Sequence, residues 1–171
     1  MAIVYQKKFL VKLPLPWQAK PLLHKAYAET TYQTFLHTSS DKKSYSLLCK
    51  MAGRTTRFSQ RTKEFIRPGV YDVLEFDLDQ PEYRRQLFSF GDFHNRRIDK
   101  TRYFVHFART TFRVDIFDFN LKGLATINTE LTHSKQKILL PPQFKIIKEI
   151  TEDPAYCSAN LVKVRSYTKE M

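Results

Sequence analysis

The stretch KTRYFVHFARTTFRVDIFDF, residues 100 to 119, sets the fold class of this chain of 171 residues. Two segments rich in aromatic and β-branched residues, KTRYFVHFA and TFRVDIFDF, are joined by Arg109 and Thr110. Residues of these types favour strands, and strands joined by so short a connection form an antiparallel pair. The stretch therefore predicts two neighbouring antiparallel strands.

Further strand patterns occur on both sides of this stretch. TYQTFLHT and SYSLLCKM flank the polar SSDKK as the arms of a hairpin would, and RFSQRTKEFI runs into the turn residues Arg67, Pro68 and Gly69. LKGLATINTELT is a strand after the Lys122–Gly123 turn, whereas VYDVLEF fits a strand or the start of a helix. The best helix pattern is DQPEYRRQLFSF, residues 79 to 90, with Asp79 as its cap. Residues 17 to 28 and the tail segment FKIIKEI predict two shorter helices.

The N-terminal segment, residues 3 to 13, alternates apolar and polar residues as a half-buried strand does. One of its faces carries cations but no carboxylate and consists of Val4, Gln6, Lys8, Leu10 and Lys12. Together these patterns predict one domain over residues 1–171. It belongs to the α+β class, is dominated by antiparallel strands with a few helices, and forms a barrel or a strongly curved sheet.

Charge is the strongest signal in the composition, with 29 Lys and Arg against 17 Asp and Glu and a formal net charge of +12. Such a surplus favours polyanionic partners, although a basic surface without a partner is equally compatible with it. With four glycines and no GxGxxG or GxxxxGK[ST] pattern, the chain has no glycine-rich phosphate loop. Cys49 and Cys157 indicate neither a disulfide framework nor a zinc site. No apolar run suggests a signal peptide or a membrane span, so a soluble, cytoplasmic protein without a membrane partner is expected.

Four segments together resemble the CYTH family, also called the triphosphate tunnel metalloenzymes. KKFLV (7–11) is similar to the end of the family's ExExKFLV strand, and IDKTRYFV (98–105) to its KTRY segment. FRVDIFDFNLKGLATINTEL (112–131) resembles FEVDVFEGxLxGLxxAEVEL, and ITEDPAYCSANL (150–161) resembles VTGDPRYxNxxL. The resemblance implies an eight-stranded antiparallel barrel whose lumen binds a triphosphate chain. In such a lumen basic residues hold phosphates and acidic residues hold Mg²⁺ or Mn²⁺.

Carried over position by position, the resemblance implies phosphate-binding roles for Lys8, Lys50, Arg57, Lys100, Arg102 and Arg113. It implies a metal-binding role for Asp115 and Glu130, and it assigns no catalytic residue. Family acids are replaced here by Val4, Gln6, Arg113 and Asn128. The family's RxR strand has no counterpart, and His37 is the nearest basic group.

Because hard divalent cations need several oxygen ligands, this loss of acids predicts weak or lost metal-dependent hydrolysis. Binding is expected to survive, with tripolyphosphate, polyphosphate, or a nucleoside or thiamine triphosphate as the ligand. Asp115 and Glu130 fit equally well as ion-pair partners of the neighbouring cations.

Two alternative functions stay open. The first is an active triphosphate phosphohydrolase that uses Mg²⁺ or Mn²⁺ with substituted ligands. The second is a nucleic-acid or protein-binding module on a repurposed barrel. Its basis is the cations of RRIDKTR and GRTTRFSQRTK, which interleave with Phe58, Tyr103 and Phe104. The alternation of those residues places them on opposite strand faces, which disfavours the nucleic-acid interpretation. The sequence does not indicate an oligomeric state.

Overall fold

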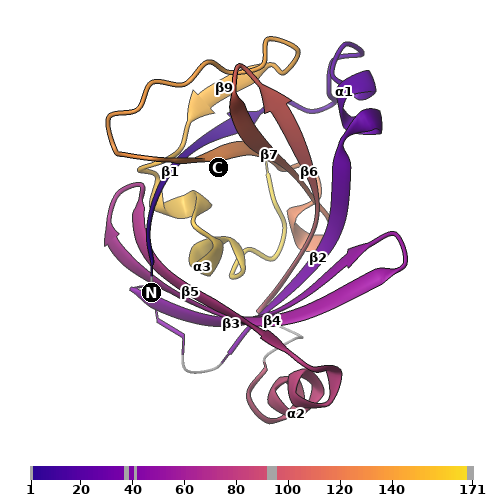
Figure 1. Ribbon diagram of the computed structural model, residues 1–171, viewed down its shortest axis with the longest axis vertical. Helices are drawn as coiled ribbons and strands as arrows, with labels where there is room; N and C mark the ends of the chain where they lie inside the picture. The colour runs from indigo at the N-terminus through magenta and orange to yellow at the C-terminus, as the bar shows by residue number, and fades with distance from the viewer. Residues whose placement is uncertain (1, 37–38, 41, 92–95, 169–171) are drawn as a thin grey trace.

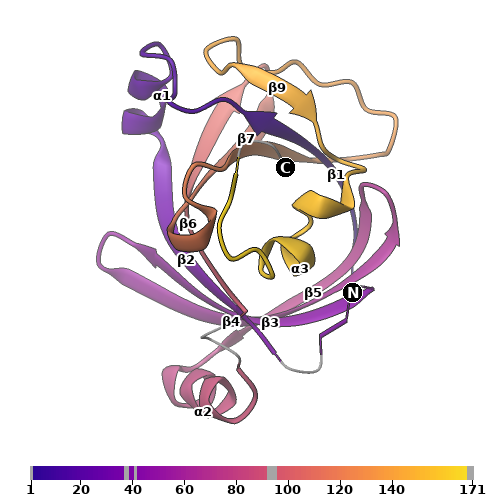
Figure 2. The same cartoon turned by 180° about the vertical axis from the view of Figure 1, so that it is seen from behind.

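Eight strands of the computed structural model close into an antiparallel barrel (Figures 1 and 2). The structure describes residues 2–36, 39–40, 42–91 and 96–168. The strands are β1 (Ala2–Val11), β2 (Tyr27–Phe35), β3 (Lys43–Ala52), β4 (Thr55–Arg67), β5 (Val70–Leu78), β6 (Arg97–Phe107), β7 (Thr110–Phe117), β8 (Ala125–Leu131) and β9 (Ile146–Glu149). The helices are α1 (Lys20–Lys25), α2 (Gln80–Phe90), α3 (Ser158–Leu161) and the short 3-10 helices η1 (Phe119–Leu121) and η2 (Pro154–Tyr156).

Strand β1 closes the barrel. The sheet runs β5-β4-β3-β2-β6-β7-β8-β1, and β1 pairs in turn with β5. One edge of β1 pairs with β8 from Tyr5 to Leu10. The other edge is divided, since its first residues pair with β5 and residues Phe9–Val11 pair with the extra strand β9. The predicted fold class, an eight-stranded antiparallel closed barrel with a few flanking helices, is confirmed.

Gly69 occupies the point where the edge of β1 passes from β5 to β9. Its carbonyl accepts a 2.8 Å hydrogen bond from the backbone N–H of Gln6. Its φ is +73°, and a Cβ there would lie 2.8 Å from Thr151 Cγ2 and 3.0 Å from the Gln6 carbonyl oxygen. Only glycine accepts this backbone conformation at so close an approach without strain.

Apolar packing fills one end of the barrel interior. Leu10, Phe35, Ile98 and Phe117 belong to this cluster, together with residues of η2 and α3. Leu10 lies on the same strand face as Gln6 and Lys8, which line the interior cavity. The C-terminal segment, yellow in Figures 1 and 2, lies within the outline of the barrel. A second apolar cluster joins the outer wall to α1, and a third lies between the wall and α2. The polar part of the lumen is thus supported from inside and outside.

Most predicted elements are confirmed. The side chain of Asp79 caps α2 by accepting a 2.8 Å hydrogen bond from the backbone N–H of Glu82, and VYDVLEF lies within strand β5. The helix predicted over residues 17–28 shortens to Lys20–Lys25, because Pro21 stands in its first turn. The helix predicted for FKIIKEI is wrong: Ile146–Glu149 form β9 on the free edge of β1. A short apolar run does not distinguish the two by its period, and tertiary pairing settles the outcome.

His37 lies outside the described residues. Within the described residues, no helix is long and apolar enough to cross a membrane.

Substitution of Gly69 by Ala is expected to lower the free energy of unfolding by roughly 1–3 kcal/mol, from left-handed backbone strain and the clash with Thr151. Gly53 provides a matched control, because its φ is +58° but a Cβ there would meet nothing within 4 Å. Urea denaturation should therefore show a larger loss for Gly69→Ala than for Gly53→Ala. Equal losses would contradict the role of the close approach.

Candidate functional site: a cation-lined lumen

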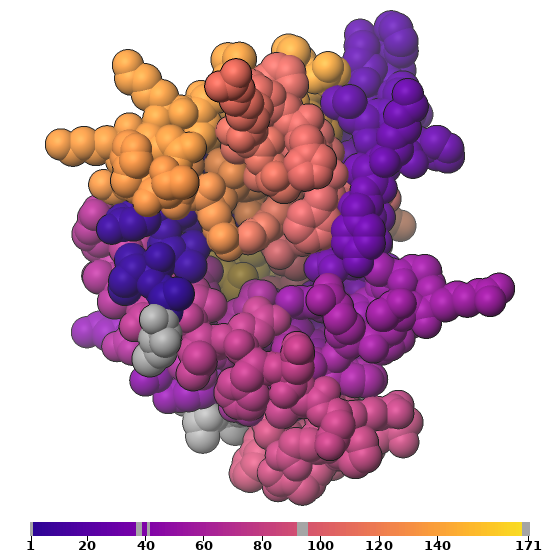
Figure 3. All heavy atoms as spheres, viewed as in Figure 1, coloured from indigo at the N-terminus to yellow at the C-terminus, as the bar shows by residue number. Residues whose placement is uncertain are grey.

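The barrel encloses a cavity of about 420 Å³. Figure 3 shows a hollow in the face viewed, with atoms of the yellow C-terminal segment at its bottom. Eight cations line the cavity: Lys8, Lys50, Arg57, Arg61, Lys63, Lys100, Arg102 and Arg113. Five acids line it as well: Glu29, Glu75, Asp115, Glu130 and Asp153. The lumen therefore carries a formal surplus of three positive charges.

The structure brings all of the predicted site residues to this cavity. The six cations predicted to bind phosphate and the two predicted metal ligands all line it. Arg61, Lys63, Glu29 and Glu75 line it too, although no role was predicted for them from the sequence. The signal for Arg61 and Lys63 was present, because they continue the alternation of Arg57 along β4. Glu75 was missed because VYDVLEF fitted a strand or the start of a helix, so the face on which Glu75 lies could not be predicted.

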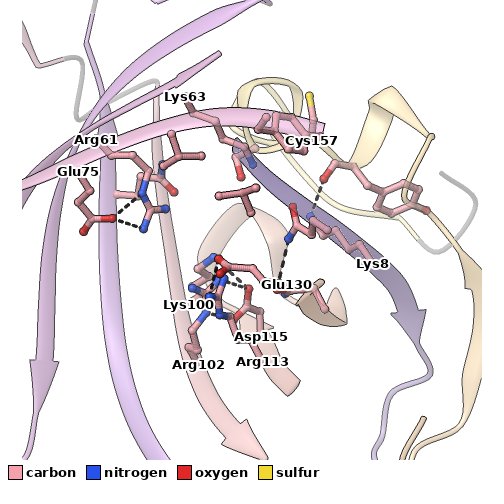
Figure 4. Close-up of a pocket in the computed structure, with 18 of the residues that line it drawn as sticks. Lys8, Arg61, Lys63, Glu75, Lys100, Arg102, Arg113, Asp115, Glu130 and Cys157 are labelled. Carbon is pink, nitrogen blue, oxygen red and sulfur yellow. Dashed lines mark hydrogen bonds and ion pairs between the residues drawn. The ribbon is translucent and has the colours of Figure 1, made fainter. Parts of the chain in front are cut away.

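Asp115 is the buried centre of the first charge cluster (Figure 4). Its carboxylate accepts hydrogen bonds from Arg102 Nε at 2.7 Å, Arg102 Nη2 at 2.8 Å and Lys100 Nζ at 3.0 Å. Antiparallel register creates this contact, since Arg102 lies directly opposite Asp115. Burial alone would raise the pKa of Asp115, but the charges of Arg102 and Lys100 outweigh it and hold that pKa far below its usual value.

Lys100 is the member of this cluster whose charged form is destabilised. Burial lowers its pKa to about 7, and the neighbouring Arg102 charge acts in the same direction, against the attraction of Asp115. One carboxylate thus serves two cations, and one positive charge is left without a counter-charge.

Glu75 is the centre of the second cluster. It accepts hydrogen bonds from Lys50 Nζ at 2.7 Å, Arg61 Nη2 at 2.7 Å and Ser59 Oγ at 2.7 Å. Burial would raise its pKa, but the charge of Arg61 and the hydrogen bonds from Lys50 and Ser59 lower it to about 2. As at Asp115, two cations from neighbouring parts of the wall, Lys50 of β3 and Arg61 of β4, therefore share one carboxylate, that of Glu75 on β5.

The remaining acids are paired farther along the wall. Arg113 Nη2 donates to Glu130 Oε1 at 2.6 Å. Arg57 forms a looser pair with Glu29, with 3.6 Å between their charged atoms. In the described structure, Asp115 and Glu130 are thus ion-pair partners of cations.

Lys8 and Lys63 have no carboxylate within ion-pairing distance among the described residues. Lys8 Nζ donates a 2.8 Å hydrogen bond to the carbonyl oxygen of Tyr156, and burial lowers its pKa. Lys63 Nζ lies 3.8 Å from the centroid of the Tyr71 ring. Burial, followed by the charges of Lys8 and Arg61, lowers the pKa of Lys63 to about 7. These two ammonium groups lack the counter-charge that the rest of the lumen has.

The comparisons with known proteins agree with this architecture. No family profile and no curated protein sequence matches the chain. The structure of the inorganic triphosphatase NE1496 superposes with a TM-score of 0.62 at 22% identity, over 98% of this chain and 99% of that one. A putative adenylate cyclase from Bacillus halodurans gives a TM-score of 0.59 at 16% identity, over 79% and 84% of the two chains. The chain has the CYTH-type tunnel fold.

Two further structural matches show how far this likeness extends. A putative adenylyl cyclase from Hippeastrum, HpAC1, described as having a dominant triphosphatase activity, gives a TM-score of 0.52 at 13% identity, over 78% and 80% of the chains. The Mediator head module of Schizosaccharomyces pombe also matches, with a TM-score of 0.54 at 9% identity, over 80% and 86%. Function therefore has to be argued from the lumen, because the fold alone does not decide it.

The donors in this CYTH-type lumen do not fit a protein-held Mg²⁺ or Mn²⁺ ion. Across the described ranges, no three His, Cys, Asp or Glu residues are grouped so that they could hold a metal ion. Asp115 already accepts from two cations, and an ion placed there would lie against Lys100 and Arg102. At the positions of two lost acids, Gln6 Nε2 donates to Asn128 Oδ1 at 3.3 Å, so these amides bind each other.

Replacement of Lys63 by Met is expected to stabilise the free protein in a pH-dependent way. Lys63 binds its proton with a pKa of about 7 in the folded chain and 10.5 in the unfolded chain, so the folded state is penalised fully below pH 7. The penalty fades as the pH rises towards 10.5. The free energy of unfolding should rise by roughly 1–3 kcal/mol at pH 6 and change little at pH 10.

Urea denaturation of the wild type and the variant at both pH values measures this. Lys12→Met is the matched control, because Lys12 is an exposed lysine outside the lumen. A gain at pH 10 equal to that at pH 6, or a loss at pH 6, would contradict a desolvated ammonium at position 63.

Proposed function

We propose that this protein binds a triphosphate-type polyanion in its lumen, with metal-dependent hydrolysis weak or lost. The observation that carries the proposal is the surplus of cations facing one cavity, eight against five acids. Lys8 and Lys63 have no ion-pair partner there among the described residues, and Lys63 and Lys100 have a pKa of about 7.

Electrostatics makes an anion the natural complement of this lumen. Two like charges 4 Å apart repel by about 4 kcal/mol at an effective dielectric constant near 20. A polyanion offers negative charge to the unpaired lysines and acceptor oxygens to the arginines, which bind phosphates through two parallel hydrogen bonds. Binding would return Lys63 and Lys100 to the charged state, because an anion nearby raises the pKa of an ammonium group.

A triphosphate is favoured over smaller anions for two reasons. The cations are spread over β1, β3, β4, β6 and β7, so one phosphate group would contact few of them. Two of the proteins that share the fold, NE1496 and HpAC1, are described as having triphosphatase activity. Their likeness to this chain supports the class of ligand. Inorganic tripolyphosphate, a longer polyphosphate and an organic triphosphate all meet this requirement.

The case for weak hydrolysis rests on the carboxylates. Metal-assisted phosphoryl transfer needs carboxylates that are available to an ion bridging the phosphates. Here Glu29, Glu75, Asp115 and Glu130 are each paired with a lumen cation. The alternative, an active enzyme using Mg²⁺ or Mn²⁺, requires the bound phosphate to release these acids from their partners.

The nucleic-acid alternative is less well supported by the wall of the barrel. Phe58 packs against Tyr83 in the outer cluster beneath α2, with ring centroids 4.6 Å apart. Tyr103 belongs to the other outer cluster. These two rings therefore lie on the opposite face from the lumen cations. Phe104 differs from that expectation, because it lines the lumen with Lys100 and Arg102. With two of the three rings facing outward, the wall does not form the row of stacking rings that single strands need.

Isothermal titration calorimetry with tripolyphosphate in the presence of EDTA is expected to show saturable binding near one ligand per chain. Lys63→Met and Lys100→Met should each weaken the binding by roughly tenfold or more, because each removes a charge facing the ligand. Lys12→Met removes an exposed lysine and should leave the affinity within about twofold.

No binding, or equal weakening by the lumen and control variants, would overturn the lumen as a polyanion site. A separate assay of phosphate release with Mg²⁺ or Mn²⁺ decides the activity. Release with multiple turnovers would establish the active triphosphatase in place of a binding protein.

A further inference from the structure

Two acid-free segments meet at one end of the barrel. They are residues 13–25, which contain α1, and residues 132–145, which lead into β9, and neither contains Asp, Glu or Arg. The backbone N–H of Lys12 donates to the carbonyl oxygen of Lys145 at 2.9 Å, and residues 16 and 18 line one surface hollow together with residues 142–145. Figures 1 and 2 place α1 and β9 at the end of the molecule opposite α2. We call the exposed residues of these two segments the lysine face.

The lysine face carries positive charge that the protein does not neutralise. Its five lysines are Lys20, Lys25, Lys135, Lys137 and Lys145. All five are exposed, and none has a carboxylate within ion-pairing distance among the described residues. Five of the twelve formal charges of the chain are thus concentrated at one end and available to an external anionic partner.

Large apolar side chains project between these lysines. Burial alternates along the second segment: Ile138 and Leu140 pack in the outer cluster that holds α1, whereas Lys137 and Leu139 are exposed. Leu139 is 63% exposed, and Trp17, in the other segment, is 75% exposed. In Figure 3, orange side chains of this region extend outward from the body of the molecule. Packing of the inward residues therefore fixes both segments and leaves apolar tips among cations.

This combination suits an anionic lipid surface better than a nucleic acid. Recognition of phosphates and bases relies on the planar fork of arginine, which both segments lack, whereas lysine is a hydrated point charge on a flexible apolar stem. Both segments lie wholly within the described residues, and Trp17 is their one large exposed ring, too few for a row of stacked bases. Tryptophan favours the membrane interface, where its ring is buried and its N–H stays hydrated, and lysines are attracted to anionic headgroups.

We propose that the lysine face binds the surface of a membrane containing anionic phospholipids, with Trp17 and Leu139 in the interface and the lysines against the headgroups. Such binding is peripheral and needs no membrane-spanning segment. It differs from the expectation of no membrane partner, which rested on the lack of an apolar run in the sequence. The lysine face contains no residue of the lumen, so the proposal is independent of the proposed function.

Co-sedimentation of the full chain with vesicles tests the proposal. Vesicles of equal parts phosphatidylcholine and phosphatidylserine should bind the chain at least roughly tenfold more tightly than phosphatidylcholine alone, and added salt should weaken this binding. The double variant Lys135→Gln with Lys137→Gln should weaken it by roughly tenfold, since each lysine near an anionic surface contributes separately.

The matched control for charge is Arg54→Gln with Arg84→Gln. Both arginines are exposed, lie outside the lysine face and have no ion-pair partner among the described residues. Their removal lowers the net charge equally and should leave vesicle binding within about twofold. Lys63→Met, which alters the lumen, should also leave it within about twofold.

Trp17 provides an independent readout, because it is the only tryptophan of the chain. Its fluorescence emission should shift to shorter wavelength on the anionic vesicles, as the ring leaves water, and brominated lipids should quench it. Trp17→Ala should weaken co-sedimentation severalfold. Phe88→Ala is the control, because Phe88 has a similar exposure of 77% but lies on α2 at the opposite end, and it should change nothing.

Several results would overturn the proposal. They are no binding to vesicles, equal binding to both lipid compositions, equal weakening by the two charge variants, and unchanged Trp17 emission on bound vesicles. Weakening by Lys63→Met as large as that by the lysine-face variant would place the headgroups in the lumen instead. If the lysine-face variant weakened binding to a single-stranded DNA oligonucleotide but not to vesicles, the face would be a nucleic-acid surface. Failure of tripolyphosphate to bind the lumen would leave this proposal unaffected.

Discussion

Closure of the barrel forces alternate side chains of eight strands into one interior, and in this chain that constraint gathers eight cations and four acids around a single cavity. A cation on an open sheet could turn to solvent, but Lys100 and Lys8 have no such freedom, and burial lowers the pKa of both. The shared acids Asp115 and Glu75 each hold two cations, which limits the repulsion without cancelling it. In the free protein, the remaining repulsion between the lumen cations is therefore unfavourable, and an anionic ligand would reduce it.

The same constraint explains why loss of acids changes the expected chemistry. Glu75, Asp115 and Glu130 are each held by a cation of a neighbouring strand, and Glu29 pairs across the lumen wall with Arg57 of β4. A divalent ion would have to displace an arginine or a lysine to bind. At Lys63 and Lys8 a polyanion meets no such competitor, because neither has a carboxylate partner in the described structure. Binding without a protein-held metal is therefore the chemistry that this arrangement favours.

Much of this could be predicted from local pattern. Alternation placed Gln6 and Lys8 on one strand face, and the resemblance to the CYTH family placed Lys8, Lys100 and Arg102 in the lumen. What could not be predicted depends on contacts between segments distant in sequence. Glu75 meets Arg61 only through the register of β4 with β5, and Lys50 reaches it from a third strand. FKIIKEI becomes β9 because β1 leaves an edge free, which its own residues do not reveal. The part of the lumen lining that comes from the C-terminal segment depends on where that segment packs, and no periodicity encodes that.

The lysine side chains themselves offer the decisive observation. Carbon-13 NMR of the lysine ε-methylene groups, assigned with Lys63→Arg and Lys100→Arg variants, reports the protonation of each ammonium group as the pH changes. In the free protein, Lys63 and Lys100 should titrate near pH 7, and saturating tripolyphosphate should move both pKa values upward towards the ordinary 10.5. If both groups titrated near 10.5 in the free protein and the ligand did not change this, the result would contradict the account that unbalanced positive charge in the lumen favours anion binding.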